Sequence, residues 1–124
     1  MARHALVVDD SMLIRHTVCR FLEERGFIVE SASNGVEAIE LLAAFMPDII
    51  ITDLLMPKMT GGEFIKSLKT KPETAKIPIV ILAGKKAGPA SPEERAANYV
   101  IYKDIDIEAQ LQKALQAALG DSGG

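Results

Sequence analysis

The stretch PDIIITDLLMPKMTGG, residues 47–62, decides how the rest of the chain is interpreted. Residues 49–52 are apolar or β-branched and lead directly to a carboxylate, Asp53. A short apolar run between turn residues is typical of a strand that is buried on both faces of a sheet. Asp53 then lies at the C-terminal end of that strand, where open α/β sheets bind their ligands. A carboxylate leaving so apolar a strand is costly to desolvate unless a cation or a hydrogen-bond donor meets it.

The size and composition of the chain fit one globular domain. It has 124 residues, of which 48% are hydrophobic, enough for a continuous core and too many for a disordered chain. We expect the domain to span residues 1–119 and residues 120–124 to form a flexible tail or the start of a linker. No apolar run approaches the roughly 20 residues of a membrane span, and the N-terminus lacks the apolar segment of a signal peptide. Because the one cysteine, Cys19, also suits a reducing compartment, we expect a cytoplasmic protein without a membrane partner.

The charge pattern argues against direct contact with nucleic acids. The net charge is -3, and the densest basic cluster is the pair Lys85 and Lys86. DNA and RNA binding depends on a concentrated basic face. Aromatic residues make up 5% of the chain and tryptophan is absent, so platforms for base stacking are poorly supplied as well.

Apolar runs of strand length alternate with segments of helical periodicity along the whole chain. The expected strands are residues 5–8, 27–31, 49–52, 77–82 and 99–102, and the expected helices are residues 12–25, 36–45, 62–69, 93–97 and 106–119. Residues 72–76 are expected to be a loop. This alternation predicts an α/β fold in which helices cover both faces of a parallel sheet. Right-handed crossovers then place the C-terminal ends of all five strands at the same edge.

Charged residues follow several of these strands. Asp9 and Asp10 come after the first strand, Asp53 after the third and Lys103 after the fifth. Carboxylates that share a site repel each other, so at least one should resist ionisation, and a hard divalent cation such as Mg²⁺ relieves the repulsion. Such a site suits phosphoryl transfer to a carboxylate nucleophile, Asp53, with Asp9 and Asp10 holding the metal and Lys103 balancing phosphoryl charge. Each residue alone has a simpler explanation, as a helix cap or a surface lysine, but the ordered set favours the site.

This ordered set resembles the receiver domain of two-component response regulators. The likeness covers residues 3–119 and includes the Met-Pro pair and the glycines downstream of Asp53. It implies a flavodoxin-like (βα)5 fold with strand order 2-1-3-4-5. It also implies that a histidine kinase or phosphotransfer protein phosphorylates Asp53, with Mg²⁺ bound by Asp9, Asp10, Asp53 and the backbone carbonyl of Leu55.

The resemblance further implies a signalling domain that assists its own aspartyl phosphorylation and dephosphorylation, and not an enzyme in the ordinary sense. Its role would be to regulate an output domain or an effector protein. The expected oligomeric state is a monomer or a weak dimer. An alternative is a degenerate receiver, which would bind partners without being phosphorylated.

Three positions depart from the usual receiver pattern and motivate that alternative. Ala83 stands where receivers carry Ser or Thr, whose hydroxyl bonds the phosphoryl group, although the amide of Gly84 is a further candidate contact. Val100 stands at the aromatic switch position, and Asp104 replaces the proline that usually follows the lysine. One hydrogen bond to a charged group contributes about 1.5–3 kcal/mol, so the loss of the hydroxyl should weaken switching more than it weakens phosphorylation itself.

Two enzyme-like or cofactor-binding classes fit less well. A phosphatase with an aspartate nucleophile needs a second acid two residues later, where Leu55 stands. A flavin-binding flavodoxin needs a loop after the first strand that accepts a phosphate. The acidic sequence VDDSML, residues 8–13, would repel one.

Overall fold

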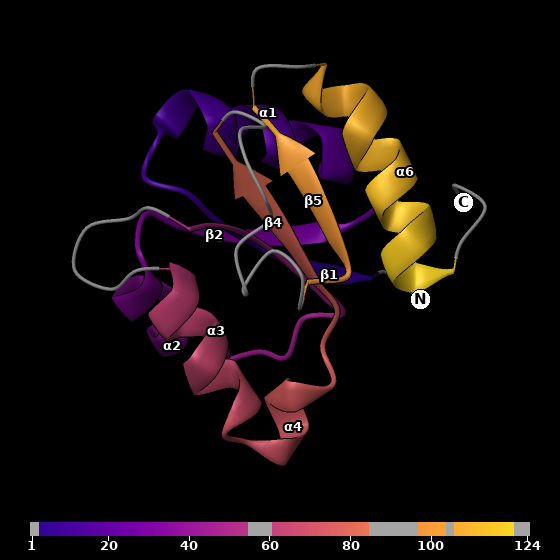
Figure 1. The fold of residues 1–124 in the computed structure, drawn as a ribbon. Helices are drawn as coiled ribbons and strands as arrows, with labels where there is room; N and C mark the ends of the chain where they lie inside the picture. Colours follow the sequence, from indigo (N-terminus) through magenta and orange to yellow (C-terminus); the bar gives the residue numbers. More distant parts are fainter. Residues whose placement is uncertain (1–2, 55–60, 85–96, 104–105, 121–124) are drawn as a thin grey trace.

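The structure of the chain is a computed structural model that describes residues 3–54, 61–84, 97–103 and 106–120. These residues form one sheet, with strands β1 (His4–Val8), β2 (Ile28–Ala32), β3 (Ile49–Asp53), β4 (Ile79–Ala83) and β5 (Tyr99–Tyr102). All neighbouring strands pair in parallel, in the order β2-β1-β3-β4-β5 (Figure 1). The predicted flavodoxin-like order is therefore confirmed.

The helices cover both faces of this sheet. They are α1 (Met12–Glu23), α2 (Gly35–Leu42), α3 (Gly61–Lys69), α4 (Pro72–Ala75) and α6 (Ile107–Leu119). Figure 1 shows α1 and α6 on one side of the sheet and α2 and α3 on the other. Since both faces are covered, β1, β3 and β4 are buried along almost their whole length, which explains their continuous apolar sequences.

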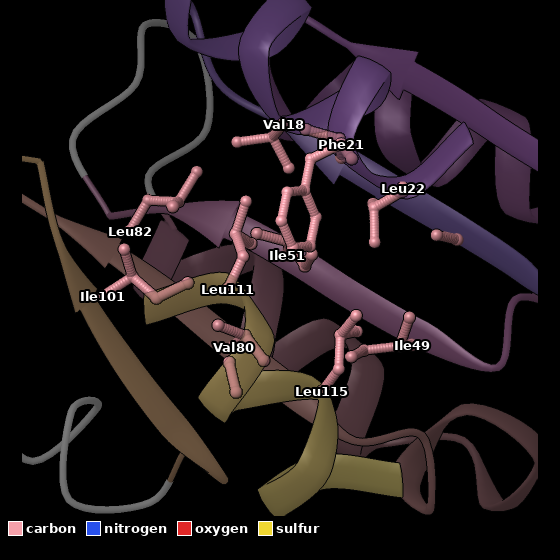
Figure 2. Close-up of a cluster of buried hydrophobic side chains, with 13 residues drawn as sticks. Val18, Phe21, Leu22, Ile49, Ile51, Val80, Leu82, Ile101, Leu111 and Leu115 are labelled. Atoms are coloured by element: carbon pink, nitrogen blue, oxygen red, sulfur yellow. The ribbon is translucent and has the colours of Figure 1, made fainter. Parts of the chain in front are cut away.

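Two hydrophobic clusters fill the space between the sheet and its helices. Under α1 and α6, Phe21 and Leu111 meet Ile51 of β3, as Figure 2 shows. Under α2 and α3, Phe64 and Leu68 pack with Ile50 of the same strand. Successive side chains of β3 thus point into opposite clusters, so β3 is held from both sides.

The strand at one edge, β2, is less buried than the central strands. Its residues Ile28 and Glu30 are exposed, in agreement with its place at the end of the predicted strand order 2-1-3-4-5. The turn between α1 and β2 contains Gly26, whose positive φ of 88° is a left-handed conformation that favours glycine. Ser11 caps the start of α1, because its Oγ accepts a hydrogen bond from the Ile14 amide at 3.3 Å.

The structure corrects the prediction of a loop over residues 72–76. Residues Pro72–Ala75 form the short helix α4, in which proline occupies the first turn, where its missing N–H is not needed. The buried Thr74 hydroxyl donates to the backbone oxygen of Leu68 and ties α4 to the end of α3.

Other element boundaries differ from the prediction by a few residues: β4 covers residues 79–83 where 77–82 were expected, and β2 covers residues 28–32 where 27–31 were expected. Helix α1 ends at Glu23 and α2 at Leu42, both earlier than expected, because the spacing of apolar residues does not mark where the last hydrogen bond closes. The helix expected over residues 93–97 falls almost wholly outside the described residues. None of the described helices combines the length and apolar character needed to cross a membrane.

Candidate functional site

The C-terminal ends of β1, β3 and β5 bring the predicted charged residues together. Asp53 is the last residue of β3, Asp9 directly follows β1, and Lys103 directly follows β5. In the parallel register Val8 pairs with Thr52, Asp53 with Leu82, and Ala83 with Tyr102. The strand ends are therefore level, and the side chains that leave them share one edge of the sheet.

Lys103 connects two of the carboxylates. Its Nζ lies 2.8 Å from Asp9 Oδ2 and donates a hydrogen bond of 2.9 Å to Asp53 Oδ2. Asp9 is fully buried and Asp53 is 6% exposed, so these ion pairs are only weakly screened by water. The contact with Asp9 lies outside hydrogen-bond geometry, which leaves Asp9 Oδ2 as a buried oxygen without a hydrogen bond among the described residues.

The remaining polar groups of Asp9 are fixed by its neighbours. Its Oδ1 accepts a hydrogen bond from the Ser11 amide at 2.8 Å, and its own amide donates to Ala32 O at 3.1 Å. The guanidinium of Arg15 donates to the Asp9 backbone oxygen at 2.8 Å. The carboxylate is thus held toward Lys103, whereas the next residue, Asp10, is exposed.

Burial and ion pairing shift the pKa values of two residues in this group. It raises the pKa of Asp9 above 3.8, and the negative charge of Asp53 adds to the rise, against the lowering effects of Lys103 and the Ser11 amide. Burial lowers the pKa of Lys103, but the close contacts and negative charges of Asp9 and Asp53 outweigh this effect and hold that pKa above 10.5. The expectation that one carboxyl resists ionisation thus agrees with Asp9, although burial, more than charge repulsion, is the main cause.

The carboxylates have the chemistry and spacing of a site for a hard cation. One oxygen each from Asp9, Asp10 and Asp53 lies within 4.8 Å of the other two. Mg²⁺ binds carboxylate oxygens together with carbonyls and waters, so the donor set fits this ion. The buried Asp9 Oδ2 has its ion pair with Lys103 but no hydrogen bond among the described residues, so it keeps a lone pair that could bind the ion. Leu55, whose carbonyl was expected to join the set, lies outside the described residues.

The predicted switch positions and the predicted phosphoryl contact carry no polar side chains. Ala83 ends β4 and is half-buried, and its methyl group can donate no hydrogen bond. Gly84 is exposed, with open space where a side chain would begin. Val100 packs against the hydrophobic cluster under α2 and α3.

One contact near the site has no counterpart in the sequence-based expectations. The side-chain amide of Gln110, on α6, bonds both backbone groups of Tyr102, the residue before Lys103. Its only signal in the sequence is a polar residue one position before Leu111 of the apolar stripe of α6. Spacing alone does not show which backbone such a side chain would meet.

Comparison with known proteins identifies the class of protein that this fold and site define. The family model of the response regulator receiver domain matches residues 5–116. The chain therefore belongs to the response regulator receiver domain family, whose members are signalling domains.

Individual relatives agree with this assignment. The chain is 40% identical over 85 residues to the phosphate regulon transcriptional regulatory protein PhoB of Escherichia coli, a match covering 68% of this chain and 37% of PhoB. It is 33% identical over 114 residues to a gliding motility regulatory protein of Myxococcus xanthus, covering 86% of this chain and 14% of that protein. The chemotaxis protein CheY4 of Vibrio cholerae superposes with a TM-score of 0.82 at 32% identity, over 95% of this chain and 99% of CheY4. The match to PhoB thus spans little more than a third of that protein.

Proposed function

We propose that this domain acts in the cytoplasm as a phosphoacceptor, taking a phosphoryl group on Asp53 from the phosphohistidine of a histidine kinase or phosphotransfer protein. The observation that carries the proposal is the position of Lys103 Nζ, within 2.9 Å of an oxygen of Asp53 and 2.8 Å of one of Asp9. The phosphorylated form would regulate an output domain or an effector protein. The proposed metal ligands are Asp9, Asp10, Asp53 and the carbonyl of Leu55.

The residues of the site suit the charge changes of this reaction. An oxygen of Asp53 forms a bond to phosphorus while the phosphorus–nitrogen bond of the donor breaks, and the electron pair of that bond stays with the imidazole, which takes up a proton. The ammonium of Lys103, already beside Asp53, stabilises the negative charge on the transferred oxygens. Bound Mg²⁺ would neutralise further charge on the carboxylates and the phosphoryl oxygens.

The conformational response to phosphorylation is expected to depend on fewer contacts than the transfer of the phosphoryl group. Ala83 supplies no hydroxyl to the phosphoryl group, so the exposed Gly84 amide is the proposed contact at the end of β4. Since one charged hydrogen bond contributes about 1.5–3 kcal/mol, the difference between the two states of the domain should be reduced by about this amount.

A phosphorylation assay tests the proposal directly. The full chain is incubated with Mg²⁺ and acetyl phosphate, and the added phosphoryl group is followed by intact-protein mass spectrometry. Wild-type protein should be modified, whereas Asp53→Asn should not. Asp48→Asn is the matched control, because Asp48 is an exposed aspartate just before the opposite end of the same strand. An inert wild-type protein, or equal modification of Asp53→Asn, would contradict the proposal.

A further inference from the structure

At the last residue of β5, a side chain hydrogen-bonds the backbone groups that face away from the sheet. Among the described residues β5 pairs with β4 alone and is therefore an edge strand. The Lys103 amide donates to Ala83 O of β4 at 2.9 Å, so the backbone groups of the preceding residue, Tyr102, point to the opposite, unpaired side. There Gln110 Oε1 accepts from Tyr102 N at 2.9 Å, and Gln110 Nε2 donates to Tyr102 O at 2.8 Å.

The Gln110 amide therefore takes the place of a neighbouring strand for one residue. Only one orientation of the amide gives an acceptor to the Tyr102 N–H and a donor to the Tyr102 carbonyl. The second hydrogen on Nε2 points to Asp106 O at 3.2 Å, in the residue that caps the start of α6. This Gln110–Tyr102 clamp joins the start of α6 to the backbone that carries Lys103.

Lys103 depends on such support because it lies just beyond the end of β5, where the hydrogen bond from its amide to Ala83 O ties its backbone to β4 on one side only. A proline after Lys103 would restrict its φ and ψ angles, but residue 104 is an aspartate. The long lysine side chain has several rotatable bonds, and its Nζ must stay within 2.9 Å of two separate carboxylates. A shift of the strand end would move that atom directly.

We infer that Gln110 is a positioning residue for the site: its clamp on Tyr102 holds the end of β5 so that Lys103 Nζ stays between Asp9 and Asp53. The inference rests on the proposed function only for its kinetic consequence. The geometric consequence, an ordered Lys103 ammonium, is independent of phosphorylation.

The test compares three variants of the full chain. Gln110→Ala removes the clamp, and Gln110→Glu keeps an acceptor for the Tyr102 amide but sets an oxygen against the Tyr102 carbonyl. Gln116→Ala is the matched control, since this exposed glutamine on the same helix has no side-chain hydrogen bond to the described residues. Water can replace the lost bonds at the strand edge, so all three variants should remain folded, which thermal melting followed by circular dichroism verifies.

The kinetic readout is the rate of phosphorylation by acetyl phosphate at saturating Mg²⁺. Gln110→Ala and Gln110→Glu should be slower than wild type by about tenfold, because a misplacement of about 1 Å costs up to about a hundredfold. Gln116→Ala should match wild type. In a Lys103→Ala background, Gln110→Ala should have no further effect, because the clamp acts through Lys103. An unchanged rate in Gln110→Ala, or a loss that persists fully without Lys103, would overturn the inference.

The second readout needs no phosphorylation. The side-chain ¹⁵N signal of Lys103 and the hydrogen exchange of the Tyr102 amide are measured by NMR in the unmodified protein. Gln110→Ala should broaden the lysine signal and speed exchange at Tyr102, while Gln116→Ala leaves both unchanged. If wild-type protein cannot be phosphorylated, the proposed function fails, and these two signals alone decide the role of Gln110. Unchanged signals in Gln110→Ala would overturn it.

Discussion

The ammonium nitrogen of Lys103 lies 2.9 Å from Asp53 Oδ2, although the two residues are 50 positions apart and leave strands that are not neighbours. β4 separates β3 from β5, so the contact exists only when all three strands are paired in register. The same nitrogen contacts Asp9 at the end of β1. One side chain thus reports whether four of the five strands are in place.

Replacing Lys103 by methionine should separate chemistry from folding. Lys103→Met keeps an apolar stem but removes the charge beside Asp53, so phosphorylation by acetyl phosphate should slow by about a hundredfold or more. Because the variant leaves the buried Asp9 without its ion-pair partner, thermal melting followed by circular dichroism verifies that it remains folded. Lys113→Met, at an exposed position of α6, is the control. A rate equal to that of the control would rule out the role given to Lys103.

The raised pKa of Asp9 predicts a specific dependence of stability on pH. Because burial raises this pKa above 3.8, the folded state binds more protons than the unfolded state over the range above 3.8. The Asp9 contribution to the free energy of unfolding therefore falls as pH rises through that range. In Asp9→Asn this pH-dependent loss of stability is absent, and Lys103 still forms its ion pair with Asp53. The stability of Asp9→Asn relative to wild type should accordingly increase with pH.

Urea unfolding at a series of pH values from about 3 to about 8, without divalent ions, measures this difference. Glu40→Gln, which changes an exposed carboxyl on α2, serves as the control. A wild-type protein that gains stability over Asp9→Asn as pH rises would show that the ion pair with Lys103 outweighs burial.

Magnesium should stabilise the folded protein through the same carboxylates. At about a hundred times its dissociation constant, a ligand that binds only the folded state adds about 2.7 kcal/mol to the free energy of unfolding. Wild-type protein should show this gain in urea unfolding with and without Mg²⁺, whereas Asp10→Asn and Asp53→Asn should lose most of it. An equal gain in Asp53→Asn would mean that the ion binds elsewhere.

The missing hydroxyl at the end of β4 can be restored. Ala83→Thr should tighten the binding of beryllofluoride, a phosphoryl analogue, by about tenfold or more, because one charged hydrogen bond contributes about 1.5–3 kcal/mol. Ala83→Val has nearly the same shape without the hydroxyl and should not tighten binding. NMR titration measures both affinities. If both variants behave alike, the effect comes from shape, and the hydroxyl has no part in it.

The arrangement of Asp9, Asp53 and Lys103 was predictable for a general reason. Buried parallel strands have recognisable sequences, and their C-terminal ends must meet at one edge, so any charged residue that follows such a strand is placed by topology. The last strand, Tyr99–Tyr102, was predicted with its observed limits because apolar residues fill it and charged residues follow.

Features that depend on particular side-chain contacts were not predictable in this way. The sequence does not indicate the Pro72–Ala75 helix, because it is too short to show periodicity; the Thr74 hydroxyl stabilises it by donating a hydrogen bond to Leu68 O. The hydrogen bonds of Gln110 depend on how α6 packs beside β5, and the local sequence does not determine that packing. The burial of Asp9 beside an exposed Asp10 likewise follows from the direction in which the chain turns after β1.

The strand order assigns the two partners of the central ion pair to regions of different local stability. Asp53 ends β3, which is paired on both sides, whereas Lys103 follows β5, an edge strand among the described residues, so local opening should cost less free energy at Lys103 than at Asp53. The acceptor can therefore remain fixed while its counter-ion is released by a partial, local unfolding. A protein that binds the exposed edge of β5 would change how often this local opening occurs, and therefore how long the Lys103–Asp53 ion pair persists.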